Sequence, residues 1–281
     1  MAFNKSWKQK QLADELAALR AKTGMSAREV GDGVGWSSTK VTRIEAVASK
    51  VTPRDVATLC KFYGVPQSDI DRLCEDARNA RSEIWWQRYS QWLTEPFAAY
   101  LSHENDAKRA WSTGPIVIPG LLQMRAYAEA LYVGTPIIQD PDRIEALTAI
   151  RMQRQQRLTE PEPLILTAFI GETALRQEYG GRKVLHDQLR YLRTLLDLPN
   201  ITVHAVPYSA DVSLWPLDLL EFEEGGPEVV FWETAASSVL QDDNIEIRQA
   251  RRLIERAESV ALSESDTVAL IEQRIKETKE A

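Results

Sequence analysis

The chain has 281 residues, enough for roughly two domains with sizeable cores. Its formal net charge of -7 argues at first against a nucleic-acid binder, but the charge is unevenly divided. Residues 1–81 hold 14 Lys and Arg against 10 Asp and Glu, a surplus of four, whereas residues 82–281 hold the remaining 20 against 31, a deficit of eleven. Such asymmetry is typical of a polyanion-binding part joined to an acidic part, although a surplus of four also fits an ordinary solvated surface.

Other classes of protein are excluded by composition. No apolar run approaches the ~20 residues of a membrane-spanning helix, and the first residues lack the apolar stretch of a secretion signal, so the sequence predicts a cytoplasmic protein. Cys60 and Cys74 fall among apolar residues in helical patterns and are interpreted as buried thiols in a reducing compartment. The isolated His103, His186 and His204 have no second ligand at metal spacing, so neither a metal nor another cofactor is predicted.

Residues 25–45, MSAREVGDGVGWSSTKVTRIE, predict two short helices joined by a turn. Ser26 is placed as an N-cap and Glu29 follows three positions later, which completes a capping box. Gly35 suits the left-handed residue that ends this helix. Ser37 then caps the second helix.

The second of these helices has two unlike faces. At 100° per residue, Val41, Ile44 and Glu45 share one face, and the opposite face is short, polar and cationic. Such a face suits the major groove of DNA, and a residue as small as Gly31 lets the preceding helix cross closely. The alternative is an ordinary helical hairpin whose outer residues are only solvated. The predicted base contacts are Ser38, Thr39, Thr42 and Arg43.

The stretch after residue 50 predicts contacts with the DNA backbone. Thr52 is a favourable N-cap, Pro53 fits the first helical position and Asp55 the third. The exposed N–H groups at this helix start, together with nearby cations, form a candidate phosphate clamp, although each cation is equally explained as surface charge. The predicted phosphate contacts are Lys40, Lys50, Thr52 and Arg54.

The order of these residues resembles the helix-turn-helix domain of phage-repressor type, the XRE family, over roughly residues 11–77. The resemblance implies an all-α domain of five helices. It also implies a structural ion pair between Arg20 and Glu45, which answers why a carboxylate lies on the inward face of a helix. The chain departs from the family at Ala27, where a long amide is usual, so one DNA contact is expected to be missing. The resemblance is carried by Gly31, Gly35, Val41 and Ile44, between the motifs LRAKTGMS and VTPRDVATLCKFYGV.

Residues 81–115 are predicted to form an aromatic-rich helical junction between a domain at 1–80 and another at 116–281. A cluster of Trp residues can stack nucleotides, line a ligand pocket or pack an interface, and packing is its commonest role. The Trp residues of this stretch are Trp85, Trp86, Trp92 and Trp111.

Residues 116–281 predict a mixed α+β domain with a small sheet. The segments with β-branched and aromatic content predict strands, and amphipathic segments between and after them predict helices. The carboxylates in GETALRQEYGG, Glu172 and Glu178, could act in a site, but Glu172 more simply suits the start of a helix that follows a strand, where the helix dipole favours an anion. No nucleophile elbow or phosphate-binding loop is present, so we expect no enzymatic activity. The predicted strands are LILTAFIG, ITVHAVPY, LDLLEFEE and EVVFWE.

Long motifs in this part resemble the C-terminal domain of the WhiJ-like, antitoxin-like transcriptional regulators of actinobacteria. Those proteins join a phage-repressor-type domain to this domain, and many are encoded beside a small acidic protein. The resemblance brings no catalytic or ligand residues. The chain has VSLWP where the family usually shows a glycine-containing turn, so a pocket built from that loop is expected to differ here. The motifs include WWQRY, IPGLLQMRAYAEALY, ETALRQEYGG and LLEFEEGGPEVVFWE.

Together these features predict a sequence-specific transcription regulator that binds double-stranded DNA. We expect a homodimer, because one helix-turn-helix reads only a half-site. The C-terminal domain is expected to bind a small protein or a small-molecule effector that modulates DNA binding. The alternative is an antitoxin-type interaction module that sequesters a small acidic partner and uses DNA binding for autoregulation.

Overall fold

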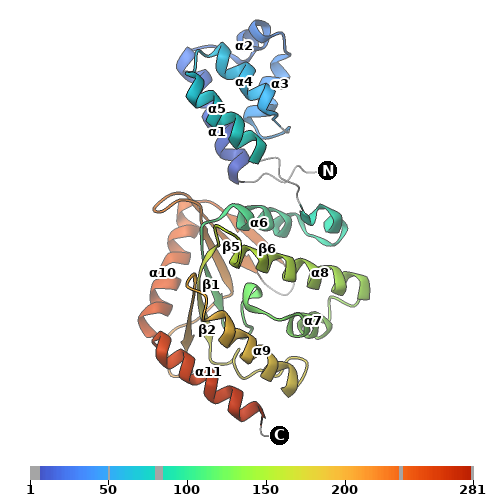
Figure 1. The fold of residues 1–281 in the computed structure, drawn as a ribbon, viewed down its shortest axis with the longest axis vertical. Coiled ribbons are helices and arrows are strands. Elements are labelled where there is room, and N and C mark those ends of the chain that lie inside the picture. Colours follow the sequence, from blue (N-terminus) through green and yellow to red (C-terminus); the bar gives the residue numbers. More distant parts are fainter. Residues whose placement is uncertain (1–6, 50, 80–84, 234–236, 280–281) are drawn as a thin grey trace. The chain divides into compact units, whose positions relative to one another are not determined.

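The computed structural model describes residues 7–49, 51–79, 85–233 and 237–279. The chain divides into two units, Met1–Arg88 and Tyr89–Ala281, and each unit has a hydrophobic core of its own (Figure 1). Within the described segments, no helix combines the length and the apolar character needed to cross a membrane.

The first unit is an all-α bundle, as predicted. All its helices contribute to one core, which includes Leu16, Val30, Val41, Leu59 and Leu73. Cys60 and Cys74 are buried free thiols, and burial raises the pKa of Cys60 to about 11, which confirms their structural interpretation. The helices are α1 (Trp7–Thr23), α2 (Ala27–Val34), α3 (Ser38–Glu45), α4 (Pro53–Phe62) and α5 (Gln67–Asn79).

The predicted helix caps are confirmed. Ser26 accepts a hydrogen bond from the backbone N–H of Glu29, whose side chain completes the capping box of α2. Gly35 ends α2 in the left-handed conformation, with a φ of 72°. Ser37 caps α3, and Thr52 caps α4. Local hydrogen bonds and backbone conformation therefore determine where α2 ends and where α3 begins.

Two glycines of α2 lie where neighbouring groups approach too closely for a side chain. A Cβ atom on Gly31 would lie 2.8 Å from the carbonyl oxygen of Trp36 and 3.1 Å from the backbone nitrogen of Ser38. A Cβ atom on Gly33 would overlap the ring of Phe62 from α4. The glycines that weaken α2 as a helix are therefore explained by tight packing against the turn and against α4.

The second unit is a mixed α+β domain built on one sheet, as predicted. The sheet has six strands in the order β3-β2-β1-β4-β5-β6. β1, β2 and β3 are parallel to one another, and the remaining neighbours are antiparallel. The strands are β1 (Arg109–Gly114), β2 (Ile165–Gly171), β3 (Ile201–Val206), β4 (Leu217–Glu221), β5 (Glu228–Glu233) and β6 (Ser238–Gln241).

Residues 81–115, predicted to form an aromatic-rich helical junction, contain the helical segments Trp85–Trp92 and Glu95–Asp106 but also a strand of the sheet. The segment RAWSTG in this stretch forms β1, which lies between β2 and β4 at the centre of the sheet. The segment mixes the strand-favouring Trp111 and Thr113 with Gly, Ser and Ala, so its composition does not mark it clearly as a strand, and pairing with two neighbouring strands decides its conformation. β6 was likewise absent from the predicted strands.

Helices cover the sheet on both sides. α10 packs on β2, β3, β4 and β5, and α11 packs on α9 and β3. Figure 1 shows α10 and α11 on one side of the sheet and α7 and α8 on the other. The helical segments are η1 (Trp85–Trp92), α6 (Glu95–Asp106), η2 (Gly120–Leu122), α7 (Arg125–Val133), α8 (Pro141–Arg154), η3 (Gln155–Leu158), α9 (Arg182–Leu195), α10 (Asn244–Val260) and α11 (Glu264–Lys279).

The connections around β1 create a topological switch point. From β1 the chain passes through α7 and α8 to β2, on one side of β1, whereas β4 pairs with the other side. β4 is antiparallel to β1, so the start of β4 lies beside the carboxyl end of β1. In open α/β sheets, ligands are commonly bound outside the carboxyl ends of the strands where the strand order reverses. The end of β1 is therefore the place in this unit where a ligand site is expected.

Candidate functional site

The structure places the two faces of α3 as predicted. Val41 and Ile44 are buried at 0% and 3% exposure. Thr39, Thr42 and Arg43 are exposed. Ser38, at the start of the helix, is exposed as well, so the four predicted base contacts lie together on the outward side of α3.

Two of these four side chains have partners within the unit. The Thr42 hydroxyl donates a hydrogen bond to the carbonyl oxygen of Ser38 at 3.0 Å, which leaves its methyl group and oxygen lone pairs on the outer face. The Arg43 guanidinium donates one hydrogen bond to the carbonyl oxygen of Ala48 at 3.1 Å. A guanidinium has five N–H donors, so Arg43 retains donors for a base edge.

The four predicted phosphate contacts differ in how their side chains are engaged. The Lys40 ammonium lies 2.6 Å from Asp55 Oδ1 and 3.6 Å from the centroid of the Trp36 ring. The Thr52 hydroxyl donates to Asp55 Oδ2 at 2.7 Å. Arg54 is exposed at the start of α4, whereas Lys50 lies outside the described residues. Of the three that are described, Arg54 is therefore the side chain most accessible to a phosphate.

Asp55 joins α3 to α4, a role that the sequence did not reveal. Burial alone would raise the pKa of Asp55, but hydrogen bonds from Lys40 and Thr52 outweigh it and hold the pKa below its usual range. The carboxylate therefore stays ionised at neutral pH and fixes the distance between the exposed face of α3 and the start of α4.

Arg20 and Glu45 form a bidentate pair. Arg20 Nε lies 2.7 Å from Glu45 Oε1, and Nη2 lies 2.9 Å from Oε2. A third N–H group of Arg20 donates to the carbonyl oxygen of Met25 at 2.8 Å. The hydrogen bond to Glu45 raises the pKa of Arg20. The pair ties α1 to the end of α3 and so orients the outward face of that helix.

The predicted Trp cluster is spread over separate positions. The rings of Trp85 and Trp86 meet edge to face with centroids 5.3 Å apart. Trp111 lies on β1 and packs with the core cluster beneath α10, where the Arg251 guanidinium lies 5.3 Å from its ring centroid. Trp111 therefore contributes to the packing of the sheet.

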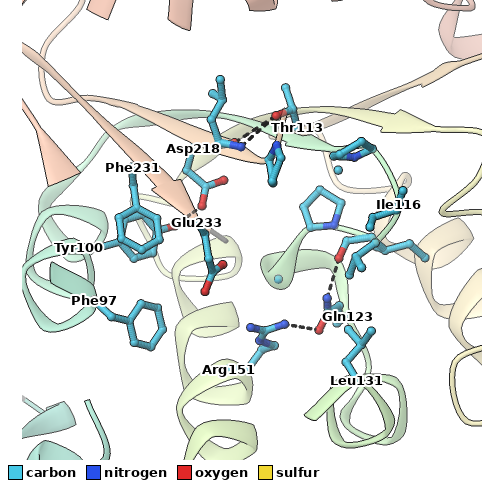
Figure 2. Close-up of a pocket in the computed structure, with 18 of the residues that line it drawn as sticks. Phe97, Tyr100, Thr113, Ile116, Gln123, Leu131, Arg151, Asp218, Phe231 and Glu233 are labelled. Atoms are coloured by element: carbon cyan, nitrogen blue, oxygen red, sulfur yellow. Dashed lines mark hydrogen bonds between the residues drawn. The ribbon is translucent and has the colours of Figure 1, made fainter. Parts of the chain in front are cut away.

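The second unit contains a cavity of about 520 Å³ at the carboxyl end of β1 (Figure 2). It is bounded by the loop after β1, by α6, α7 and α8, and by the facing ends of β4 and β5. Leu214 and Pro216 of the VSLWP loop also line it. No sequence motif predicts this cavity, because its walls come from segments far apart in the chain.

One side of the cavity is backed by a buried polar cluster around Arg154. The guanidinium donates to both carboxylate oxygens of Glu104, at 2.8 and 2.6 Å, and to the Tyr100 hydroxyl at 2.8 Å. Tyr100 in turn lies 2.8 Å from Asp218 Oδ2, and Asp218 also accepts a hydrogen bond from Ser112. Burial raises the pKa values of Tyr100 and Asp218.

A second guanidinium, that of Arg151, points into the cavity from α8. Its Nη1 donates to Gln123 Oε1 at 2.6 Å, and its Cζ lies 4.9 Å from the centroid of the Tyr132 ring. Gln123 is itself 1% exposed and donates to the carbonyl oxygen of Ile118 at 2.6 Å. The Arg151 side chain is therefore held by a fixed, neutral neighbour.

The other residues considered for chemistry have local structural partners. Glu172 pairs with Arg176 at 2.7 Å and accepts a hydrogen bond from the backbone of Tyr208 at 3.2 Å. His186 and His204 each hydrogen-bond a backbone carbonyl. Within the described part of the chain, no group of three or more potential ligands is placed to hold a metal ion.

Comparison with known proteins assigns both halves of the chain. Residues 11–73 match a helix-turn-helix domain, and residues 97–273, more than half of the chain, match a domain of unknown function, DUF5753. A search of curated proteins finds no match. The first match agrees with the geometry of α2 and α3, and the second encloses the sheet and most of the residues that line the cavity.

Proposed function

Since the chain belongs to the DUF5753 family and carries a helix-turn-helix domain ahead of it, we propose that it is a sequence-specific transcription regulator. One observation carries this proposal: α3 buries Val41 and Ile44 and turns Thr39, Thr42 and Arg43 outward. A helix with this face enters the major groove, where Arg pairs with guanine. Thr either hydrogen-bonds a base edge through its hydroxyl group or contacts the thymine methyl group.

The surroundings of the predicted residues indicate which of them contact bases and which contact phosphates. Ser38, Thr39, Thr42 and Arg43 read base edges, and Arg54 at the start of α4 contacts phosphate. Lys40 contacts phosphate only if its ion pair with Asp55 is given up or shared. We propose a homodimer, since a single recognition helix reads a half-site and a second copy supplies the other half.

The second unit serves as the sensor for this regulator. Its cavity and its acidic composition suit a domain that binds an effector, a small molecule or a small protein, and alters the affinity of the first unit for DNA. We propose that it has no enzymatic activity, since the sequence contains no nucleophile elbow and no phosphate-binding loop.

The test is genome-wide DNA capture with the tagged full chain, with co-purified proteins identified from the same sample. We expect a small number of sharp peaks that share a palindromic motif, and the loss of these peaks with Arg43→Ala. Arg78→Ala is the matched control, because Arg78 lies on α5 and pairs with Glu75. A flat profile from a folded, full-length protein would contradict sequence-specific regulation.

A second candidate is an antitoxin-type interaction module, as in WhiJ-like regulators, that sequesters a small partner and uses DNA binding for autoregulation. The observation in its favour is a set of exposed apolar side chains on the second unit: Val133 at 65%, Ile137 at 57% and Trp215 at 60%. The surplus of acidic residues in this part of the chain opposes an acidic partner, so contact would depend on these apolar groups. A stoichiometric partner that is lost with Trp215→Ser, together with a flat DNA profile, would favour this candidate.

A further inference from the structure

The cavity at the end of β1 has the size and position of a small-molecule site. Its volume of about 520 Å³ lies within the range of roughly 300–1,000 Å³ that is common for such sites. It also lies at the topological switch point of the sheet, outside the carboxyl end of a central strand.

Arg151 forms no direct ion pair with any described residue. The side chain is half-buried, its known partners Gln123 and Tyr132 are neutral, and within the described residues it forms no ion pair with a carboxylate. Its Nε is shut off from solvent and has no hydrogen-bond acceptor. Leaving a guanidinium in this state is costly unless an anion completes its hydrogen bonds.

Arg154, one turn further along α8, differs from Arg151 because its N–H donors have partners inside the protein. Its guanidinium also borders the cavity, but Glu104 and Tyr100 occupy its donors and Asp218 lies behind Tyr100. The same helix therefore presents one guanidinium that is paired inside the protein and one that is not. An incoming anion would find its partner at Arg151.

The acidic groups that face the cavity do not supply this partner. Asp218 belongs to the cluster around Arg154 and accepts a hydrogen bond from Ser112. Glu233 lies at the end of β5 and its side chain points into the cavity on the side of Arg151 (Figure 2), but the residue is exposed and forms no ion pair with Arg151. A hydrated carboxylate needs no ligand to stabilise it, whereas the enclosed Nε of Arg151 does. An anionic ligand is therefore favoured over a cationic one.

The remaining walls are apolar. The rings of Tyr100 and Phe231 stack with centroids 4.2 Å apart, and Phe97 lies beside Tyr100 at 6.0 Å. Aliphatic side chains such as Ile116 and Leu131 line the facing side of the cavity (Figure 2). These walls suit a ligand with a hydrophobic body of aromatic or alkyl type.

We propose that this cavity binds a small organic acid, whose carboxylate pairs with Arg151 and whose hydrophobic body lies between the aromatic wall and the aliphatic wall. The inference deepens the proposed function, because it names the chemical class of the effector, and it rests on that function only for the consequence that binding alters DNA affinity. Gln123 acts as a positioning residue, since it fixes the guanidinium through Ile118.

The test uses isothermal titration of the full chain without DNA. The probes are naphthylacetate and octanoate, each compared with its uncharged amide and with an amine of similar size. We expect at least one of the two carboxylates to bind, with affinity on the order of tenfold to a hundredfold above its amide, because a charge-assisted hydrogen bond is lost in the amide. The amines should bind more weakly still.

Two variants locate the site. Arg151→Gln should reduce carboxylate binding to the level of the amide, while Arg125→Gln should leave it unchanged, since Arg125 pairs with Glu145 outside the cavity lining. Equal binding of acid and amide by the unmodified protein, preference for the amine, or no binding of either acid would overturn the inference. These comparisons do not depend on how Arg151→Gln folds.

The two proposals fail in different ways. If no carboxylate binds but sharp DNA peaks are found, the ligand inference fails and the regulator remains. If a carboxylate binds through Arg151 and the DNA profile is flat, the inference on the cavity stands and the proposed regulation fails. If both hold, fluorescence anisotropy with an operator duplex should show affinity that changes on addition of the bound acid.

Discussion

At the scale of single residues, the outward and inward sides of α3 have different tasks. Thr39, Thr42 and Arg43 are exposed on one side, while Glu45 on the other is bound by Arg20. Substitutions on the two sides should therefore separate effects on DNA recognition from effects on folding.

Arg43→Ala should weaken binding to the cognate DNA site by about 1–3 kcal/mol and relax the preference at one base position. The reason is the loss of a two-bond contact with a base, against which the single bond to Ala48 is a small cost in stability. Anisotropy titrations with a cognate duplex and with single-position variants would measure both changes. Unchanged cognate affinity would mean that α3 does not lie in the groove as proposed.

Glu45→Ala should destabilise the first unit by about 1–3 kcal/mol, because it leaves the partly enclosed Arg20 without its partner. Hydrogen exchange in the full chain would show faster exchange of the amides of α1 and α3, while the amides of the sheet keep their rates. The double variant Arg20→Met with Glu45→Leu should recover part of the loss, since no unpaired charge remains. Equal protection in the single variant and the native protein would contradict this role.

At the scale of elements, the turn between α2 and α3 depends on close approach. Gly31 faces the backbone of Trp36 and Ser38, and Gly33 faces Phe62. Asp55 then connects α3 with the cap of α4. The position of the recognition helix is thus fixed from three directions, by the turn, by α4 and, through Arg20, by α1.

Gly31→Ala should destabilise the first unit by about 1–3 kcal/mol and also weaken DNA binding, although Ala is the better helix former. The added Cβ meets backbone atoms at 2.8 and 3.1 Å, so the start of α3 must shift. Asp32→Ala is the control, because its side chain is exposed on the same helix. Hydrogen exchange would compare the stability of the two variants, and anisotropy titrations would compare their DNA affinity. If Gly31→Ala left the stability unchanged or raised it, the turn would have room for a Cβ atom, and this explanation would be wrong.

In the molecule as a whole, basic residues are in excess in residues 1–81 and acidic residues are in excess in residues 82–281. The surplus of four basic residues in residues 1–81 accompanies the recognition helix, and the deficit of eleven accompanies the sheet and its cavity. Nonspecific attraction to DNA is therefore confined to the first part, and the number of phosphate contacts should be small.

Arg54→Ala should weaken binding to all duplexes by a similar factor and lower the slope of log affinity against log salt by about one. Arg54 is exposed at the start of α4, where a phosphate contact carries no sequence information. Titrations of cognate and unrelated duplexes over a series of salt concentrations would measure this slope, with Arg78→Ala as the control. A change confined to the cognate duplex would instead assign Arg54 to base recognition.

The helices of the first unit and the two faces of α3 could be predicted from the order of residues along the chain. Ser26, Gly35, Ser37 and Thr52 act through hydrogen bonds and backbone angles within a few residues, so their effects are readable in order along the chain. The sequence also indicated the mixed second unit and four of its strands, because those segments have strand composition.

The remaining features depend on contacts between segments that are distant in the chain. RAWSTG is a strand because β2 and β4 pair with it, and Lys40 reaches Asp55 because α3 and α4 share one core. The cavity gathers Phe97, Arg151 and Asp218 from distant segments, and its unpaired charge depends on which carboxylates the fold gives to Arg154 rather than to Arg151. Local hydrogen bonds leave a pattern in the sequence, whereas contacts between remote segments arise only when the chain has folded.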